Sequence, residues 1–172
     1  MPGCGKSTIG RQLARMRELA FLDVDHEIEH RLSCSIREFF DREGESAFRD
    51  LEQHVLAELL SGPRIGVIAT GGGAVLRADN RAALRCASTV VYLRAQPDDL
   101  ARRLCRDTHR PLLQVADPRQ RLRDLYAIRD PLYRETAHMA IDTAHRSAAT
   151  IVNLANMQLD MLTPLDREHG PE

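Results

Sequence analysis

A glycine-rich segment at the start of the chain, MPGCGKST, contains most of a phosphate-binding loop. The loop pattern is G-x-x-x-x-G-K-[ST], and Gly5, Lys6 and Ser7 fill its last three fixed positions. Amides of such a loop lie at a helix N-terminus, where unpaired N–H groups and the helix dipole favour anions. We therefore predict that the loop binds nucleotide phosphates and that Ser7 coordinates Mg²⁺. The predicted nucleotide-binding residues of the loop are Gly3, Cys4, Gly5, Lys6, Ser7 and Thr8.

Lys6 is the only lysine among the 24 lysine and arginine residues of the chain. A compact ammonium can reach between the β- and γ-phosphates of a nucleotide, whereas a planar guanidinium is too wide. The alternative interpretation is a glycine turn capped by a serine. The first glycine of the pattern would precede Met1, so we expect the natural start to lie upstream, with a glycine directly before Met1 and an apolar strand before that.

Two carboxylates, Asp23 and Asp25, follow the short apolar run Phe21-Leu22, which is expected to be a strand. One carboxylate could bind hydrated Mg²⁺, and the other could accept a hydrogen bond from a substrate hydroxyl and take its proton. The alternative is a structural role, with Asp25 capping a helix over residues 26–32 and Asp23 as a loop acid. The phosphate loop favours the catalytic interpretation.

A second glycine-rich segment, Thr70-Gly71-Gly72-Gly73-Ala74, follows the apolar run 65–69. Glycines let a backbone approach a ligand closely and offer N–H donors to it. The carboxyl ends of strands are where open α/β sheets bind ligands, so Gly71, Gly72 and Gly73 are candidate substrate-binding residues. A tight turn without function is the alternative.

Arginines could bind the negative charges of the substrates. Arg49 lies on a predicted helix, Arg110 in a predicted loop and Arg129 near the end of another helix. Taken singly, each is most simply interpreted as a surface arginine. Acidic residues predominate between residues 18 and 52, and arginines between residues 94 and 134, which would place a metal-binding side opposite an arginine-bearing side.

The segment His26-Glu27-Ile28-Glu29-His30 matches H-E-x-x-H, the helical signature of zinc proteases. A zinc site also requires a third ligand and a cleft, whereas this segment begins at a predicted helix start and forms an acidic surface. We therefore treat a zinc hydrolase as a distant alternative.

These candidate residues must be positioned by alternating helices and strands. Hydrophobic periodicity predicts strands at 21–23, 65–69, 89–93 and 138–142. It predicts helices at 7–17, 26–32, 36–41, 45–60, 77–84, 97–105, 119–134 and 148–162, with Gly44 as a break. The alternation favours an α/β fold with a parallel sheet and right-handed crossovers. No linker or repeat is evident, so residues 1–172 are expected to form a single domain with a frayed tail over 164–172.

The composition is that of a globular enzyme. The chain has 172 residues, of which 43% are hydrophobic and 28% charged, and its net charge is -1. A nearly neutral chain is not expected to bind nucleic acid, and no apolar run is long enough to span a membrane. The four cysteines are scattered, as expected for reduced thiols in the cytoplasm.

The motifs together resemble the shikimate kinase family. The resemblance covers nearly the whole chain and comprises GKSTIGRQLA, FLDVD, GESAFRDLE, TGGGAV, VVYL, RPLL and RDPLYR, in the family's order. It implies a P-loop fold of the nucleoside-monophosphate-kinase type, a three-layer sandwich with a parallel sheet in the order 2-3-1-4-5, of which this chain would lack the first strand. It also implies a substrate-binding segment at about 25–61 and a lid at about 106–118.

The resemblance implies ATP-dependent phosphorylation of the 3-hydroxyl of shikimate, a step toward chorismate and the aromatic amino acids. Lys6 and Ser7 would hold phosphate and Mg²⁺, with Asp23 acting on the metal through water. Asp25 would bind the reacting hydroxyl and take its proton. Arg110 would move in with the lid to stabilise the transferring phosphoryl group.

The resemblance further implies that Arg49 and Arg129 bind the shikimate carboxylate with help from the Gly71–Gly73 amides, and that Arg103 stacks on adenine. The family's proline on the other face of adenine has no match near Ser147-Ala148. We expect a monomer that uses ATP and Mg²⁺. The alternatives are another small-metabolite kinase, such as a gluconate-type kinase, and a nucleotide-binding fragment without turnover.

Overall fold

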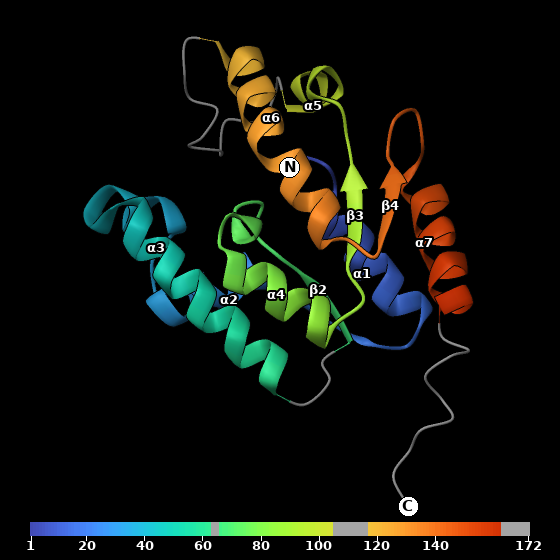
Figure 1. Ribbon diagram of the computed structural model, residues 1–172, viewed down its shortest axis with the longest axis horizontal. Coiled ribbons are helices and arrows are strands. Elements are labelled where there is room, and N and C mark those ends of the chain that lie inside the picture. The colour runs from blue at the N-terminus through green and yellow to red at the C-terminus, as the bar shows by residue number, and fades with distance from the viewer. Residues whose placement is uncertain (63–65, 105–116, 163–172) are drawn as a thin grey trace, which may run out of the picture.

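The structure is a computed structural model that describes residues 1–62, 66–104 and 117–162 (Figure 1). Its strands are β1 (Ala20–Asp23), β2 (Gly66–Ala69), β3 (Val91–Arg94) and β4 (Met139–Asp142). Its helices are α1 (Lys6–Met16), α2 (Val24–Leu32), α3 (Ile36–Ser61), the 3₁₀ helix η1 (Ala74–Leu76), α4 (Ala78–Ala87), α5 (Pro97–Leu104), α6 (Pro118–Thr136) and α7 (Ala148–Leu162). This alternation confirms the predicted α/β class.

The strands form two parallel pairs. In the first pair β1 lies beside β2, with Asp23 opposite Ala69, and in the second β3 lies beside β4, with Arg94 opposite Asp142. No strand among the described residues joins the two pairs. In the predicted family order 2-3-1-4-5, the pair β1-β2 corresponds to family strands 2-3 and the pair β3-β4 to family strands 4-5.

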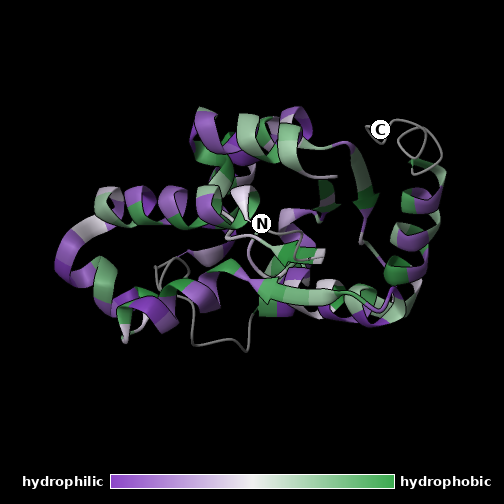
Figure 2. Ribbon diagram, turned by 90° about the horizontal axis from the view of Figure 1, so that it is seen from below, coloured by the Kyte–Doolittle hydropathy of each residue, from purple (hydrophilic) through white to green (hydrophobic). Residues whose placement is uncertain are grey.

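Two apolar clusters hold the layers together. The larger cluster joins α1 and α7 to β3, β4, α5 and α6, and includes the fully buried Leu100 and Leu122. The smaller cluster joins α2, α3 and α4, and the side chains of Leu22 and Ile68 pack on it from β1 and β2. Burying one such aliphatic side chain contributes about 1.5–3 kcal/mol, so the two clusters dominate stability. Figure 2 shows that the long helices carry both hydrophobic and hydrophilic residues, as expected for outer layers.

The observed helix boundaries differ from the prediction at the start of α2 and agree with it at Gly44. Asp23, rather than Asp25, caps α2, because its Oδ1 accepts from the backbone N–H of Asp25 at 3.1 Å. The helices predicted at 36–41 and 45–60 both fall within α3, and the predicted break at Gly44 is confirmed, because Gly44 has a non-helical conformation (φ 83°, ψ 171°). The positive φ of Gly44 kinks the chain between the two helical parts.

Some predictions lie outside the described residues. The segment 105–116 contains Arg110 and most of the predicted lid, and the predicted frayed tail falls within 163–172. In the part of the chain that the structure describes, no helix combines the length and the apolar character needed to cross a bilayer.

Candidate active site

The phosphate loop leads directly into α1. Gly3 (φ 74°) and Gly5 (φ 93°) both have left-handed backbones, which explains why glycine is needed at these positions. Gly5 is the N-cap of α1 and has no side chain to cap the first turn, so amides of that turn can donate to an anion. The ammonium of Lys6 donates to the carbonyl of Met1 at 3.2 Å, so its charge is held within the loop.

Ser7 and Asp23 bring the phosphate loop and β1 together. The Ser7 hydroxyl donates to Oδ2 of Asp23 at 2.5 Å, while Oδ1 of Asp23 accepts from the amide of Asp25. A hydroxyl and a carboxylate in contact at the mouth of a phosphate loop are the oxygen ligands that Mg²⁺ prefers. These residues therefore fit the metal predicted from the sequence.

Asp25 lies in the first turn of α2 and is half-buried. Burial raises the pKa of its carboxyl, the charge of Lys6 opposes this rise, and the charge of Asp23 adds to it. Lys6 and Asp25 are thus close enough for their charges to interact, on the same side of the molecule. The phosphate loop and the candidate base therefore lie near each other in the fold.

The triple-glycine loop between β2 and η1 lets charged side chains approach the backbone. A Cβ on Gly71 would lie 2.5 Å from Oε1 of Glu52 and 2.7 Å from Oδ1 of Asp25. A Cβ on Gly73 would lie 2.2 Å from Nη1 of Arg49. A side chain at either position would displace these carboxylates or this guanidinium, so the glycines make room for charged groups rather than for an unusual φ.

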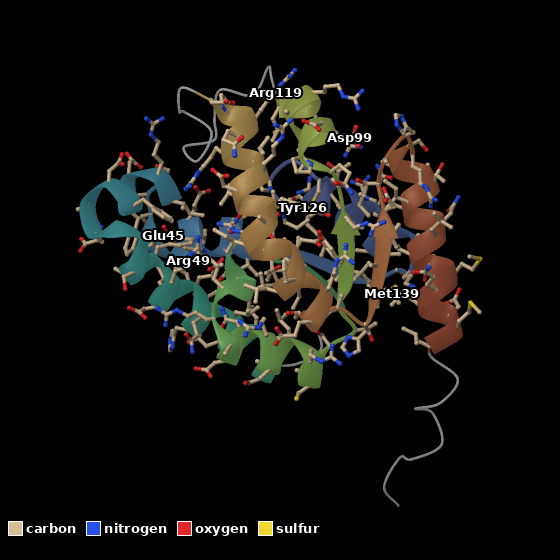
Figure 3. All side chains as sticks on the ribbon, turned by 45° about the horizontal axis from the view of Figure 1, so that its top comes forward. Glu45, Arg49, Asp99, Arg119, Tyr126 and Met139 are labelled. Atoms are coloured by element: carbon tan, nitrogen blue, oxygen red, sulfur yellow. The ribbon has the colours of Figure 1, made fainter. Side chains whose placement is uncertain are left out.

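Arg49 reaches this loop from α3, where Figure 3 places it beside Glu45. Its guanidinium donates to Oε2 of Glu52 at 2.5 Å and to Oε1 of Glu45 at 3.1 Å. Burial opposes the charged form, but the two carboxylates outweigh burial and raise the pKa of Arg49. The guanidinium is thus a permanent positive charge against the backbone of Gly73.

Glu52 is a site residue that the sequence analysis missed. Its side chain is 1% exposed, and its Oε1 has no hydrogen-bond partner among the described residues. Burial raises the pKa of Glu52, and the charge of Arg49 partly offsets the rise. A signal was available, because Glu52 follows Phe48 by four residues and precedes Val55 by three. It therefore falls on the buried stripe of α3, where an acid requires a partner.

Arg129 approaches the triple-glycine loop from α6. It is 4% exposed, and its Nη1 donates to the carbonyl of Gly72 at 3.1 Å. The hydroxyl of Tyr133, one turn later, donates to the same carbonyl at 2.6 Å. Arg49 and Arg129, which are 80 positions apart in the sequence, thus reach one loop from two different helices.

Arg103 lies at the end of α5, and its Nη2 donates to the carbonyl of Thr143 at 2.9 Å. Thr143 directly follows β4, so Arg103 lies against the loop between β4 and α7. The same loop contains Ser147, near which the family's adenine-contacting proline would lie. Arg110, the remaining predicted site residue, lies outside the described residues.

The H-E-x-x-H segment does not form a metal site in the described residues, where no group of three or more potential ligands occurs. His26 and His30 are exposed on α2. Glu27 pairs with Arg31, and Glu29 accepts from the backbone N–H of Ile36 at the start of α3. The acidic residues of the segment therefore have structural roles.

A parallel α/β fold with a phosphate loop, a nearby carboxylate and buried arginines at one loop defines a P-loop kinase of small molecules. The family model for shikimate kinase matches residues 2–159, and this chain belongs to that family. It is 52% identical to the shikimate kinase of Ralstonia nicotianae over 159 residues, which are 92% of this chain and 83% of that protein. It is also 52% identical to the Paracidovorax citrulli enzyme over 165 residues, covering 94% and 89% of the two chains.

Solved structures agree with this family. Shikimate kinase from Acinetobacter baumannii in complex with shikimate superposes with a TM-score of 0.88 at 46% identity, covering 95% of this chain and 90% of that chain. Shikimate kinase from Bacteroides thetaiotaomicron superposes with a TM-score of 0.84 at 30% identity, covering 92% and 94%. These neighbours confirm the predicted fold.

Proposed function

We propose that this protein transfers the γ-phosphoryl group of ATP to the 3-hydroxyl of shikimate, giving 3-phosphoshikimate and ADP. The observation that carries the proposal is the convergence of Asp25, Arg49 and Arg129 on the triple-glycine loop, beside the loop that contains Lys6. One carboxylate for a hydroxyl and two guanidiniums for a carboxylate match the functional groups of shikimate.

In the proposed reaction, the shikimate hydroxyl attacks the γ-phosphorus of ATP, and the bond from that phosphorus to the β,γ-bridging oxygen breaks. Asp25 orients the hydroxyl and takes its proton, while Lys6 and the loop amides stabilise charge on the phosphates. Phosphoryl transfer depends mainly on such positioning and charge stabilisation. Arg110 is proposed to add a further positive charge from the lid.

Mg²⁺ would be held by Ser7 directly and by Asp23 through water. The close contact of their oxygens supports this assignment. Mg²⁺ usually keeps several waters and binds through one or two protein oxygens plus substrate phosphates, so two side chains suffice. When bound, the ion neutralises phosphate charge.

Arg103 is proposed to stack on adenine, which its position against the loop after β4 supports. The proposed substrate-binding segment at about 25–61 covers nearly all of α2 and α3, and these helices carry Asp25, Arg49 and Glu52. The predicted monomer stays a prediction.

Coupled measurement of ADP release with ATP, MgCl₂ and shikimate tests the proposed function. Turnover should depend on shikimate and should not occur with gluconate at the same concentration. Turnover with gluconate alone would support the other small-metabolite kinase. Nucleotide binding without release of ADP would support the fragment without turnover.

Replacement of Arg129 by alanine should raise the KM for shikimate much more than the KM for ATP. The lost contact is a charge-assisted one at a buried position, worth about 2–5 kcal/mol, or roughly 30-fold or more in KM. Steady-state kinetics with each substrate varied in turn would measure the effect. An unchanged KM for shikimate would contradict the carboxylate-binding role of Arg129.

Gly73→Ala should also raise the KM for shikimate, because the new Cβ would displace the Arg49 guanidinium from its present position. An increase of about tenfold is expected for a contact of this type. A double-mutant cycle tests the cause: in an Arg49→Ala background, Gly73→Ala should have little further effect. Equal effects in both backgrounds would show that Gly73 does not act through Arg49.

A further inference from the structure

The orientation of one peptide group in the triple-glycine loop depends on side chains of α6. The Gly72 carbonyl accepts from the Tyr133 hydroxyl at 2.6 Å and from Nη1 of Arg129 at 3.1 Å. All peptide bonds of the described residues are trans, so the N–H of Gly73 points opposite to the Gly72 carbonyl and away from Tyr133. No described residue accepts a hydrogen bond from the N–H of Gly71, Gly72 or Gly73.

The ring of Tyr133 is itself held firmly. It stacks on Tyr92 of β3, with ring centroids 4.9 Å apart and planes inclined by 29°. The Tyr92 hydroxyl donates to Asp130 at 2.7 Å, and Asp130 also accepts from Arg134 at 2.7 Å. Through Tyr92, strand β3 thus fixes the Tyr133 hydroxyl, and this hydroxyl donates to the loop that follows β2. Burial raises the pKa of Tyr133 to about 12, so the hydroxyl is a donor at physiological pH.

We propose that Tyr133 is a positioning residue for shikimate, whose hydroxyl holds the Gly72–Gly73 peptide so that the Gly73 N–H is presented to the substrate carboxylate. Arg129 also donates to this carbonyl, but the Tyr133 hydroxyl allows the Arg129 guanidinium to move toward the substrate carboxylate without leaving the Gly72 carbonyl unpaired. The Tyr133 hydroxyl would donate to the Gly72 carbonyl both with and without bound shikimate. The inference rests on the proposed function.

Tyr133→Phe tests the inference, because it removes the hydroxyl and retains the ring that stacks on Tyr92. The KM for shikimate should rise about fivefold to tenfold, as expected for one neutral hydrogen bond, with kcat nearly unchanged. The KM for ATP should rise less, although the same hydroxyl also accepts from the Met1 amino group at 3.1 Å. In amide NMR spectra, shikimate should shift the Gly73 resonance of the wild type more than that of the variant.

Tyr92→Phe is the matched control. It removes a buried hydroxyl from the same stacked pair, but that hydroxyl contacts Asp130 rather than the glycine loop. Tyr92→Phe should lower the melting temperature and leave the KM for shikimate unchanged. An unchanged KM in Tyr133→Phe, or equal increases in both variants, would overturn the inference. If the wild type does not phosphorylate shikimate, the proposed function itself fails.

Discussion

Asp25→Asn is expected to lower kcat by about 10²–10⁴-fold, the range usual for loss of a general base. The amide keeps nearly the shape of the carboxylate but cannot take the proton of the attacking hydroxyl. Nucleotide affinity should change little, because Asp25 faces the triple-glycine loop rather than the phosphate amides. Steady-state kinetics and calorimetric titration with ATP would measure both quantities.

The pH dependence gives a second measurement of the same role. Burial raises the pKa of Asp25, and the carboxylate is the active form, so kcat/KM should fall as the pH falls through this raised pKa. A raised pKa also means that the folded protein binds the proton more tightly than the unfolded chain does. The free energy of unfolding therefore decreases as the pH rises through the folded pKa.

Asp25→Asn should consequently have a higher melting temperature than the wild type at pH 7, and the difference should shrink in acid. The control is Asp41→Asn, which removes an exposed carboxylate of α3 and should leave kcat unchanged. A higher KM for shikimate with an unchanged kcat would show that Asp25 binds the hydroxyl without taking its proton.

Lys6→Ala is expected to reduce kcat by at least about 10²–10³-fold, the usual cost of removing one donor to a developing negative charge. The ammonium belongs to the phosphate loop, where it now donates to a backbone carbonyl, and ATP phosphates would replace that acceptor. Lys6→Arg should not restore turnover, because a guanidinium is too wide for the loop. Single-turnover measurement of ADP formation would separate slow chemistry from weak binding.

Arg15→Ala is the control for Lys6→Ala. It removes an exposed positive charge from the same helix, and turnover should be unchanged. Restoration of activity by Lys6→Arg would contradict the geometric reason given for lysine, and near-normal kcat in Lys6→Ala would contradict the phosphate-binding role.

The local elements were largely predictable because their signals are local. Glycine at positions 3 and 5 meets the need for a left-handed backbone, and the predicted start of α5 at Pro97 is confirmed. The prediction was wrong at the cap of α2, because Asp23 and Asp25 are both good caps and only the chain path between β1 and α2 decides between them.

By itself, the sequence determined the class of fold and the family, since apolar periodicity and spaced motifs are properties of the chain alone. It also pointed to Lys6, Asp25, Arg49 and Arg129 as site residues, though it could not say that they meet. Only the tertiary structure decided that Glu52 faces Asp25 across Gly71 and that Tyr133 holds the Gly72 carbonyl. These contacts join α3 and α6 to a distant loop, and such long-range packing leaves no local pattern in the sequence.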